Sequence, residues 1–326
     1  MIATHKEGND NMTNAHFNKA RNEKNDEFYT KLADVSKEMM HYRDHFKDKT
    51  VLCNCDDPKW SAFWKYFHLN FSALGLKKLI STHYDKNNPT YRKEYTGGDD
   101  NNIEVGVKTP LEGNGDFRNQ ECLDILDEAD IVVTNPPFSL FREYVSVLME
   151  HNKKFLIIGN KNAVSYKDFF PLLKNGDVWI GYSYPSEFDT PNGEPKNLLG
   201  LCCWFTNFGV AKRPEKLILR KKYTPEEYPP YDNYDAIEVG KVADIPVDYN
   251  GVMGVPITFL DKYNPDQFEI LDINPHFFME ILAGKSKPRQ LSLRNVGRTK
   301  DPYARILIRA RHPHPAGVPV VFDEYE

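Results

Sequence analysis

The chain has 326 residues, of which 40% are hydrophobic and 27% charged, and its formal net charge is −5. This composition is typical of a globular protein with one large or two modest domains, and the negative charge argues against an indiscriminate coat for nucleic acid. No apolar run approaches the roughly 18 residues of a membrane-spanning helix, and the polar residues 1–24 lack a signal-peptide core, so we expect a disordered leader on a cytoplasmic protein.

Helices and short apolar strands alternate in the first third of the chain. Apolar residues at three- and four-residue steps predict a helix over residues 30–47, followed by a strand at 50–55. A helix with a buried aromatic stripe is expected next, formed by Trp60, Phe63, Trp64, Phe67 and Phe71. Residues 77–83 predict a second strand. The polar residues 86–102 read as a surface excursion, with an edge strand at 103–107.

The same alternation continues through the middle of the chain. The expected elements are a short helix at 122–129, a strand at 130–135, a helix at 139–150, a strand at 155–159 and a helix at 165–174. Strands and helices that alternate at this spacing predict an α/β fold with a doubly wound, mostly parallel sheet.

Four polar or aromatic stretches follow predicted strands or enter the connections between them. They are Cys53–Asp57, Tyr84–Asp85, Asp116–Phe117 and Asn135–Phe138. Ligands of doubly wound sheets bind at the carboxyl ends of the strands. The sequence therefore predicts one active site at that edge.

From about residue 177 the rhythm changes. Residues 178–182 and 199–207 predict a hairpin added to the sheet. Residues 208–326, dense in proline, tyrosine and aspartate, predict an irregular module with a flexible basic tail. We thus expect a leader at 1–24, a catalytic domain at 25–207 and a further region at 208–326.

Basic residues are concentrated in two segments. Residues 285–311 hold nine Lys or Arg against one Asp, and residues 212–222 hold six against one Glu. Two such segments on an acidic chain indicate either a local surface that faces a polyanion or a solvated tail and loop.

The stretch Asn135-Pro136-Pro137-Phe138 ends an apolar strand in a stiff turn. An amide side chain, fixed carbonyls and an exposed aromatic ring suit a flat ring that bears an amine, such as adenine. If the Asn135 side-chain oxygen and the Pro136 carbonyl each accept one amine hydrogen, the nitrogen lone pair is directed at a methyl donor. Phe138 can stack on the base. Such catalysis needs alignment with a sulfonium methyl group and no strong base.

A donor such as S-adenosylmethionine needs acceptors for its ribose hydroxyls and its adenine amine. Asp56, Asp57 and Asp85 are placed for the hydroxyls, although an acidic residue at a strand end is as often a helix cap. Tyr84 is an alternative to Asp85. Asp116 with Phe117 is placed for the adenine. The five cysteines form no CxxC pair and are expected to be reduced, with no metal site.

Eight stretches in this order resemble the DNA adenine-N6 methyltransferases, and within them the EcoRI modification methylase family. They are DEFYT (26–30), CNCDDP (53–58), LGLKKLI (74–80), GDFR (115–118), DIVVTNPPFSLF (130–141), KKFLII (153–158), YDNYDAI (231–237) and DYNGVMGVPITFL (248–260). The resemblance implies the class I fold of enzymes that use S-adenosylmethionine. It also implies a C-terminal target-recognition region.

The resemblance assigns roles to individual residues. Asn135, Pro136, Pro137 and Phe138 would be catalytic. The residues that would contact the cofactor are Phe28, Tyr29, Thr30, Cys53, Asn54, Asp56, Asp57, Asp85, Asp116 and Phe117. The residues expected to contact DNA come from the basic segment at 212–222 and not from the resemblance; they are Lys212, Arg213, Arg220, Lys221 and Lys222. The sequence Cys-Asn-Cys-Asp-Asp departs from the usual glycine-rich cofactor loop.

The predicted function is a site-specific DNA methyltransferase that acts on an adenine flipped out of duplex DNA, the modification half of a restriction–modification system. A monomer is favoured, with a cognate endonuclease that acts on the same site without a stable complex. The alternatives are methylation of RNA adenine or of protein glutamine, and a DNA-binding relative that has lost catalysis. The intact Asn135–Phe138 argues against the last.

Overall fold

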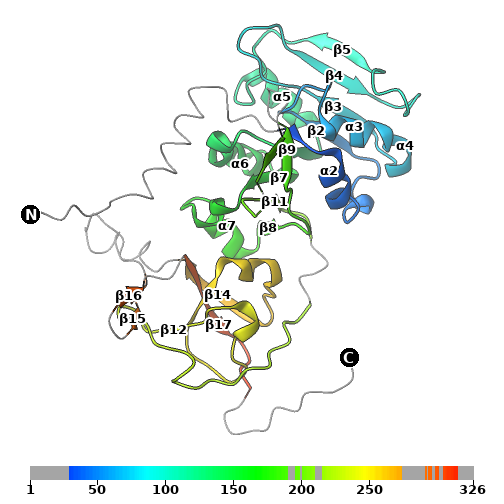
Figure 1. The fold of residues 1–326 in the computed structure, drawn as a ribbon. Helices are drawn as coiled ribbons and strands as arrows, with labels where there is room; N and C mark the ends of the chain where they lie inside the picture. Colours follow the sequence, from blue (N-terminus) through cyan, green and yellow to red (C-terminus); the bar gives the residue numbers. More distant parts are fainter. Residues whose placement is uncertain are drawn as a thin grey trace, which may run out of the picture. The chain divides into compact units, whose positions relative to one another are not determined.

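A computed structural model describes residues 29–189, 195–198, 200–209, 215–273, 291, 293–295, 298–300 and 304–314. The chain divides into two compact units (Figure 1). Unit 1 comprises residues 1–162 and 180–208, and unit 2 comprises residues 163–179 and 209–326. Unit 2 thus includes residues 163–179, which the sequence groups with the catalytic domain.

An eight-stranded mixed sheet forms the centre of unit 1, in the order β5-β4-β3-β2-β6-β7-β11-β8. The bounds are β2 Thr50–Cys53, β3 Lys78–Ser81, β4 Tyr91–Tyr95, β5 Val107–Pro110, β6 Ile131–Thr134, β7 Lys154–Asn160, β8 Trp179–Ile180 and β11 Cys202–Thr206. The strands β3, β2, β6 and β7 are mutually parallel, whereas β4, β5 and β11 are antiparallel to their neighbours. The fold is therefore mixed α/β, and the added strand next to β7 is confirmed. The prediction of a mostly parallel sheet needs correction, because the sheet is parallel only at its centre and antiparallel strands flank that centre on both sides.

Strand order reverses beside β2. The chain passes from β2 to its neighbour β3, then returns to place β6 on the other side of β2. Such a reversal is the point at which open α/β sheets bind ligands. The carboxyl ends of β2 and β6 are thus the expected centre of a site.

Helices cover the two faces of this sheet, with α2, α3 and α4 on one side and α5 and α6 on the other (Figure 1). Their bounds are α2 Leu32–Met39, α3 Ala62–Leu69, α4 Phe71–Leu74, α5 Gln120–Glu128 and α6 Phe141–Glu150. Alternate strand residues meet each layer, so that Val51, Leu79 and Val133 pack in one core cluster with the residues of α2 to α4.

Two helix predictions need correction. The helix expected over 30–47 ends at Met39, and Arg43–His45 form a 3-10 turn instead. Apolar residues three and four apart suit both kinds of turn, so their spacing does not separate them. Trp60 is 47% exposed and lies outside the aromatic stripe, because Ser61 caps α3 by accepting a hydrogen bond from Trp64 N.

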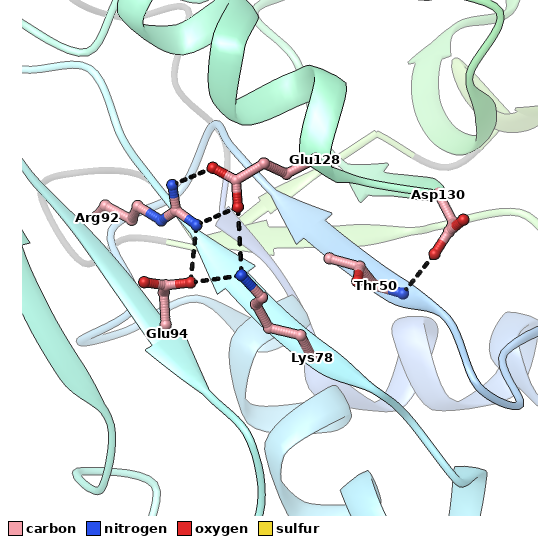
Figure 2. Close-up of polar contacts among 6 residues, drawn as sticks. All are labelled: Thr50, Lys78, Arg92, Glu94, Glu128 and Asp130. Carbon is pink, nitrogen blue, oxygen red and sulfur yellow. Dashed lines mark hydrogen bonds and ion pairs between the residues drawn. The ribbon is translucent and has the colours of Figure 1, made fainter.

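Strand β4 was missed, and the edge strand is β5 at Val107–Pro110, not at 103–107. The β4 sequence Tyr-Arg-Lys-Glu-Tyr is charged, and these charges have partners. Arg92 and Glu94 join an ion network with Lys78 and Glu128 (Figure 2). Lys93 is buried and donates to Ile103 O at 2.9 Å. Ion pairs and hydrogen bonds therefore stabilise this charged strand in the sheet, and it shows no apolar alternation that would predict it.

A second, three-stranded sheet lies in unit 1. It joins β1 Tyr29–Thr30 to β9 Glu187–Asp189, and β9 to β10 Pro195–Asn197, with both pairs antiparallel. The sequence predicts only a loop in the region of β9 and β10. These strands are two or three residues long, too short for a period to be visible.

Unit 2 contains a four-stranded sheet in the order β12-β13-β17-β14. The bounds are β12 Ile237–Glu238, β13 Met253–Pro256, β14 Phe268–Ile273 and β17 Arg305–Ala310, with a separate pair of β15 Leu293–Asn295 and β16 Arg298–Lys300. The prediction of an irregular module with a flexible tail is wrong for this sheet. Ile306, Leu307 and Ile308 are fully buried between two neighbouring strands.

The helix predicted over 165–174 also belongs to unit 2. It is shorter, as α7 at Phe170–Asn175, and it follows a 3-10 turn at Lys161–Ser165. Gly176 ends α7 in the left-handed conformation, with φ +79°.

Candidate active site

Strand β6 ends at Thr134, and the four residues after it form a rigid turn. Asn135 is 7% exposed, Pro136 is buried, and Pro137 and Phe138 are half-buried. Leu140 N donates to Pro137 O at 3.0 Å, which starts the 3-10 turn that leads into α6. The predicted exposed ring needs correction, because Phe138 packs against the main core cluster of unit 1.

Three elements meet at the carboxyl end of β2. Asn54 is buried there, and its Oδ1 accepts a hydrogen bond of 2.5 Å from the hydroxyl of Tyr144, a residue of α6. The Tyr144 ring in turn contacts Phe117 edge to face, with centroids 5.0 Å apart. Residues from the loop after β2, from α6 and from the loop before α5 therefore form one connected cluster. The sequence alone does not predict this contact, because Tyr144 has the helical spacing of an ordinary core residue.

The loop that carries Asp116 and Phe117 is fixed to the end of β3. Gly115 has φ +75°, and a Cβ there would lie 1.9 Å from His83 O. Asp85 N donates to Asn114 O at 3.0 Å. Only glycine permits this approach, so the loop lies next to the strand end that the sequence predicted to share its site.

Asp57 is enclosed by two aromatic side chains. Its Oδ1 accepts a 2.7 Å hydrogen bond from the Tyr91 hydroxyl, and its Oδ2 lies 3.7 Å from His83 Nε2. Burial lowers the pKa of His83, and the nearby Asp57 charge opposes this shift. Both carboxylate oxygens of Asp57 thus have partners inside the protein.

The remaining predicted acidic residues also have partners. Asp116 accepts hydrogen bonds from Arg118 at both oxygens, and these bonds lower the pKa of Asp116. Asp85 accepts hydrogen bonds from Asn87 and Asn88. Asp56 is buried, and its backbone oxygen lies 3.5 Å from Ser81 Oγ. Tyr84, the alternative to Asp85, is exposed.

The segment Tyr29–Thr30 lies beside the loop that follows β2. The Tyr29 ring contacts Trp60 edge to face, with centroids 5.9 Å apart. Thr30 is buried, and its Oγ1 has no hydrogen-bond partner within the part of the chain that the structure describes. A buried hydroxyl of this kind fits a contact with a polar ligand. Phe28, predicted with them, lies outside the described residues.

Burial favours the neutral form of both thiols at the end of β2. Burial raises the pKa of Cys55 to about 12, and it raises the pKa of Cys53 well above its usual value. Among the described residues, no group of three His, Cys, Asp or Glu side chains could hold a metal ion. No helix in the described ranges is long and apolar enough to cross a membrane.

The predicted DNA contacts belong to unit 2. Arg220, Lys221 and Lys222 are exposed there, with Lys221 Nζ 3.4 Å from Glu227, whereas Lys212 and Arg213 lie outside the described residues. In the second basic segment, Arg305 forms an ion pair with Glu238 at 2.6 Å. That guanidinium is therefore committed to the fold of unit 2.

Comparison with known proteins gives consistent matches along most of the chain. The family model described as adenine-specific methyltransferase EcoRI matches residues 16–311. The chain is 43% identical over 331 residues to the type II methyltransferase M.EcoRI of Escherichia coli, covering 92% of this chain and 97% of that protein.

Two mycoplasma proteins are similar to nearly the same extent. Identity is 40% over 318 residues with the type II methyltransferase M.MgeORF184P of Mycoplasma genitalium, covering 90% of this chain and 98% of that protein. It is 38% over 320 residues with the type II methyltransferase M.MpnI of Mycoplasma pneumoniae, covering 91% and 98%. No solved structure matches the chain.

Proposed function

The chain belongs to the EcoRI family of adenine-specific methyltransferases, and from this premise we propose that it methylates N6 of adenine in duplex DNA as the modification enzyme of a restriction–modification system. The observation that carries the residue assignments is the position of Asn135–Phe138. They follow β6 directly, beside β2, where the strand order of the sheet reverses.

Asn135 and Pro136 would bind the target amine. The side-chain oxygen of Asn135 and the backbone oxygen of Pro136 would each accept one N–H of the adenine N6 group. The nitrogen lone pair, delocalised into the ring in free adenine, is then directed out of the ring plane. Because both residues are buried in a turn fixed by two prolines, the acceptors need little reorganisation during the reaction.

Phe138 would hold the plane of the base. The core packing of its ring restricts its orientation, so a base that stacks on its accessible part is held in a defined plane. Base–aromatic stacking contributes about 1–3 kcal/mol. Extrusion of an adenine from the duplex costs a few kcal/mol, which this contact would partly offset.

S-adenosyl-L-methionine is the methyl donor that this function implies, and the residues present fit it. The buried hydroxyl of Thr30, with Tyr29 beside it, would hold the methionine end. Asp85 and the loop from Cys53 to Asp57 would line the ribose side, and Asp116 with Phe117 the adenine side. The donor supplies an electrophilic sulfonium methyl group. The protein's part is alignment of that group with the target amine.

Unit 2 would recognise the target site. Arg220, Lys221 and Lys222 are exposed and would contact phosphates, as would Lys212 and Arg213. Side chains elsewhere in unit 2 would read base edges, at about 1–3 kcal/mol for each good contact. A module of this size favours duplex DNA over a protein glutamine or an RNA adenine as substrate. Because the chain is acidic overall, binding to phosphates would be confined to such a local basic surface.

In the direct test, the purified protein is incubated with methyl-labelled S-adenosylmethionine and unmethylated plasmid DNA, and the modified bases are then mapped. We expect N6-methyladenine at one short recognition sequence, and loss of labelling in Asn135→Ala with DNA binding retained. Labelling of tRNA or of a protein in preference to plasmid would point to the alternative substrates. Equal labelling by Asn135→Ala would refute the catalytic assignment.

A further inference from the structure

Helix α2 carries a fully buried carboxylate that the proposed reaction does not use. Glu38 Oε1 accepts hydrogen bonds from the Tyr42 hydroxyl at 3.0 Å and from Tyr182 N at 2.8 Å. Its Oε2 accepts both donors of Ser183, the backbone N–H at 2.6 Å and the hydroxyl at 2.7 Å. Burying a carboxylate is costly unless it is hydrogen-bonded. Four donors from two parts of the chain meet that requirement.

The backbone at 181–183 is shaped to receive this carboxylate. A Cβ at Gly181 would lie 2.2 Å from Glu38 Oε1 and 2.7 Å from Trp204 Cβ. The Tyr182 ring stacks on His41, with centroids 4.1 Å apart and planes 15° from parallel. The absence of a side chain at residue 181 therefore permits the close approach of α2.

Two further contacts continue along the same pair of segments. Lys31 Nζ lies 2.5 Å from Asp189 Oδ1, and Asp34 Oδ2 accepts a 3.2 Å hydrogen bond from Ser186 N. Together with Glu38 these contacts run antiparallel, from 31 and 189 to 38 and 182. We call this set, Lys31, Asp34 and Glu38 with their partners, the α2 clamp.

The α2 clamp begins where the segment Tyr29–Thr30, proposed to bind S-adenosylmethionine, ends. Thr30 immediately precedes Lys31, and β1 holds only two residues, with Tyr29 opposite Asp189 and Thr30 opposite Phe188. So short a ladder is marginal alone. The ion pair of Lys31 with Asp189 adds a further contact directly beside this ladder.

We propose that Glu38 is a positioning residue for the methyl donor, an inference that rests on the proposed function. By holding α2 on residues 181–183, its carboxylate fixes the direction of Tyr29 and Thr30 toward the methionine end of S-adenosylmethionine. Glu38 touches neither substrate. Its loss should weaken donor binding and leave the methyl-transfer step and DNA binding nearly unchanged.

The Glu38→Gln variant tests this with little change of volume. The amide keeps one acceptor oxygen and replaces the other with an NH₂ group. Whichever oxygen is replaced, the NH₂ group would face N–H or O–H donors and could not accept their hydrogen bonds. We expect the Kd and the KM for S-adenosylmethionine to rise at least tenfold. We expect kcat at saturating donor, and the Kd for DNA, to stay within twofold.

Three variants separate positioning from stability. Ser183→Ala removes one donor from the 181–183 side and is the milder form of the test if Glu38→Gln does not fold. Tyr42→Phe removes one hydrogen bond to the same carboxylate but leaves the link to residues 182–183 intact. Its Kd for S-adenosylmethionine should therefore stay within twofold, although its Tm falls. Glu150→Gln, at an exposed site of α6, controls for the chemical change.

Calorimetric titration of each full-length variant with S-adenosylmethionine decides the outcome. Weak binding of S-adenosylmethionine in Glu38→Gln, with normal binding in Tyr42→Phe and Glu150→Gln, supports the clamp; Ser183→Ala takes the place of Glu38→Gln if that variant does not fold. Unchanged affinity in whichever of these two variants is used, or equal weakening in Tyr42→Phe, overturns it. If Thr30→Val alone loses affinity, the donor site stands and the clamp fails. If the wild-type chain binds no S-adenosylmethionine, the proposed function fails and the clamp with it.

Discussion

Tyr144 and Asn54 lie 90 positions apart in the chain, and the Tyr144 hydroxyl donates a 2.5 Å hydrogen bond to Asn54 Oδ1. Burial raises the pKa of Tyr144 well above its usual value, so the group remains a donor throughout the working range of pH. This bond joins α6, which follows the proposed catalytic residues, to the loop at the end of β2. The two halves of the proposed site are thus directly coupled.

The Tyr144→Phe variant should lose this coupling. Removal of the hydroxyl leaves the buried Asn54 oxygen with a weaker set of donors, which costs about 1–3 kcal/mol. We expect a lower free energy of unfolding and weaker binding of S-adenosylmethionine, measured by urea unfolding and calorimetry. Tyr228→Phe removes a comparable hydroxyl in unit 2, where Tyr228 donates to Asp244 O. It should lower stability without a change in donor affinity, and a similar loss of affinity would contradict the prediction.

Gly115→Ala should disrupt the loop of Asp116 and Phe117. The substitution adds a Cβ 1.9 Å from His83 O at a φ of +75°, so a steric clash is added to backbone strain of about 1–3 kcal/mol. Gly200→Ala is the matched control, because Gly200 has φ +77° with no atom within 4 Å of the added carbon. We expect Gly115→Ala to have the lower Tm and the weaker donor binding. Equal Tm values would show that the contact with His83 is dispensable.

The ion network of Figure 2 should make stability depend on pH. Arg92, and then Lys78, hold the pKa of Glu128 at about 2, below its ordinary value near 4.3. A lowered pKa in the folded state means that the stabilisation is fully present above about pH 4.3 and fades as the pH falls toward 2.

The Glu128→Gln variant measures this stabilisation. The side chain of Glu128 is 40% exposed, so solvent screening limits the expected loss at pH 7 to about 0.5–1 kcal/mol. Urea unfolding of the wild type and the variant should give curves that converge as the pH is lowered from 5 to 3. A difference that grows as the pH falls would exclude this assignment.

Binding to DNA should weaken as salt is added, and the exposed cations of unit 2 should contribute to the slope. If Lys222 contacts one phosphate, Lys222→Gln should reduce the slope of log K against log salt by about 0.9. Lys37→Gln, at an exposed position of α2, should leave the slope unchanged. The measurement is a titration of labelled duplex at several salt concentrations. An unchanged slope in Lys222→Gln would remove this residue from the phosphate contacts.

The parallel centre of the sheet could be predicted because its strands are buried apolar runs with clear ends. Every residue of β6 is buried, whichever face of the sheet it points to, and two prolines follow the end of this strand. Ile157 of β7 is likewise fully buried. An uninterrupted apolar run carries this information locally. The resemblance of the chain to a family rests on the same well-marked stretches.

The features that were missed depend on partners that lie outside the local sequence pattern. Lys93 reads as a surface residue until Ile103 and Trp64 are seen beside it. Arg305 reads as part of a basic tail until Glu238 is seen to pair with it, 67 positions earlier. Neither pairing leaves a local trace in the sequence. The same holds for Tyr144, whose helical spacing is that of any core residue.

The α2 clamp also has a consequence for synthesis on the ribosome. Glu38 and Tyr182 are 144 positions apart, so α2 leaves the ribosome long before the backbone that it binds. At about 5–20 residues per second, the delay is roughly 7–30 s. During that interval the parallel strands β2, β3, β6 and β7 are all made, while the Glu38 carboxylate lacks three of its four donors. A nascent chain halted before residue 182 would therefore contain the four central strands without a fixed β1.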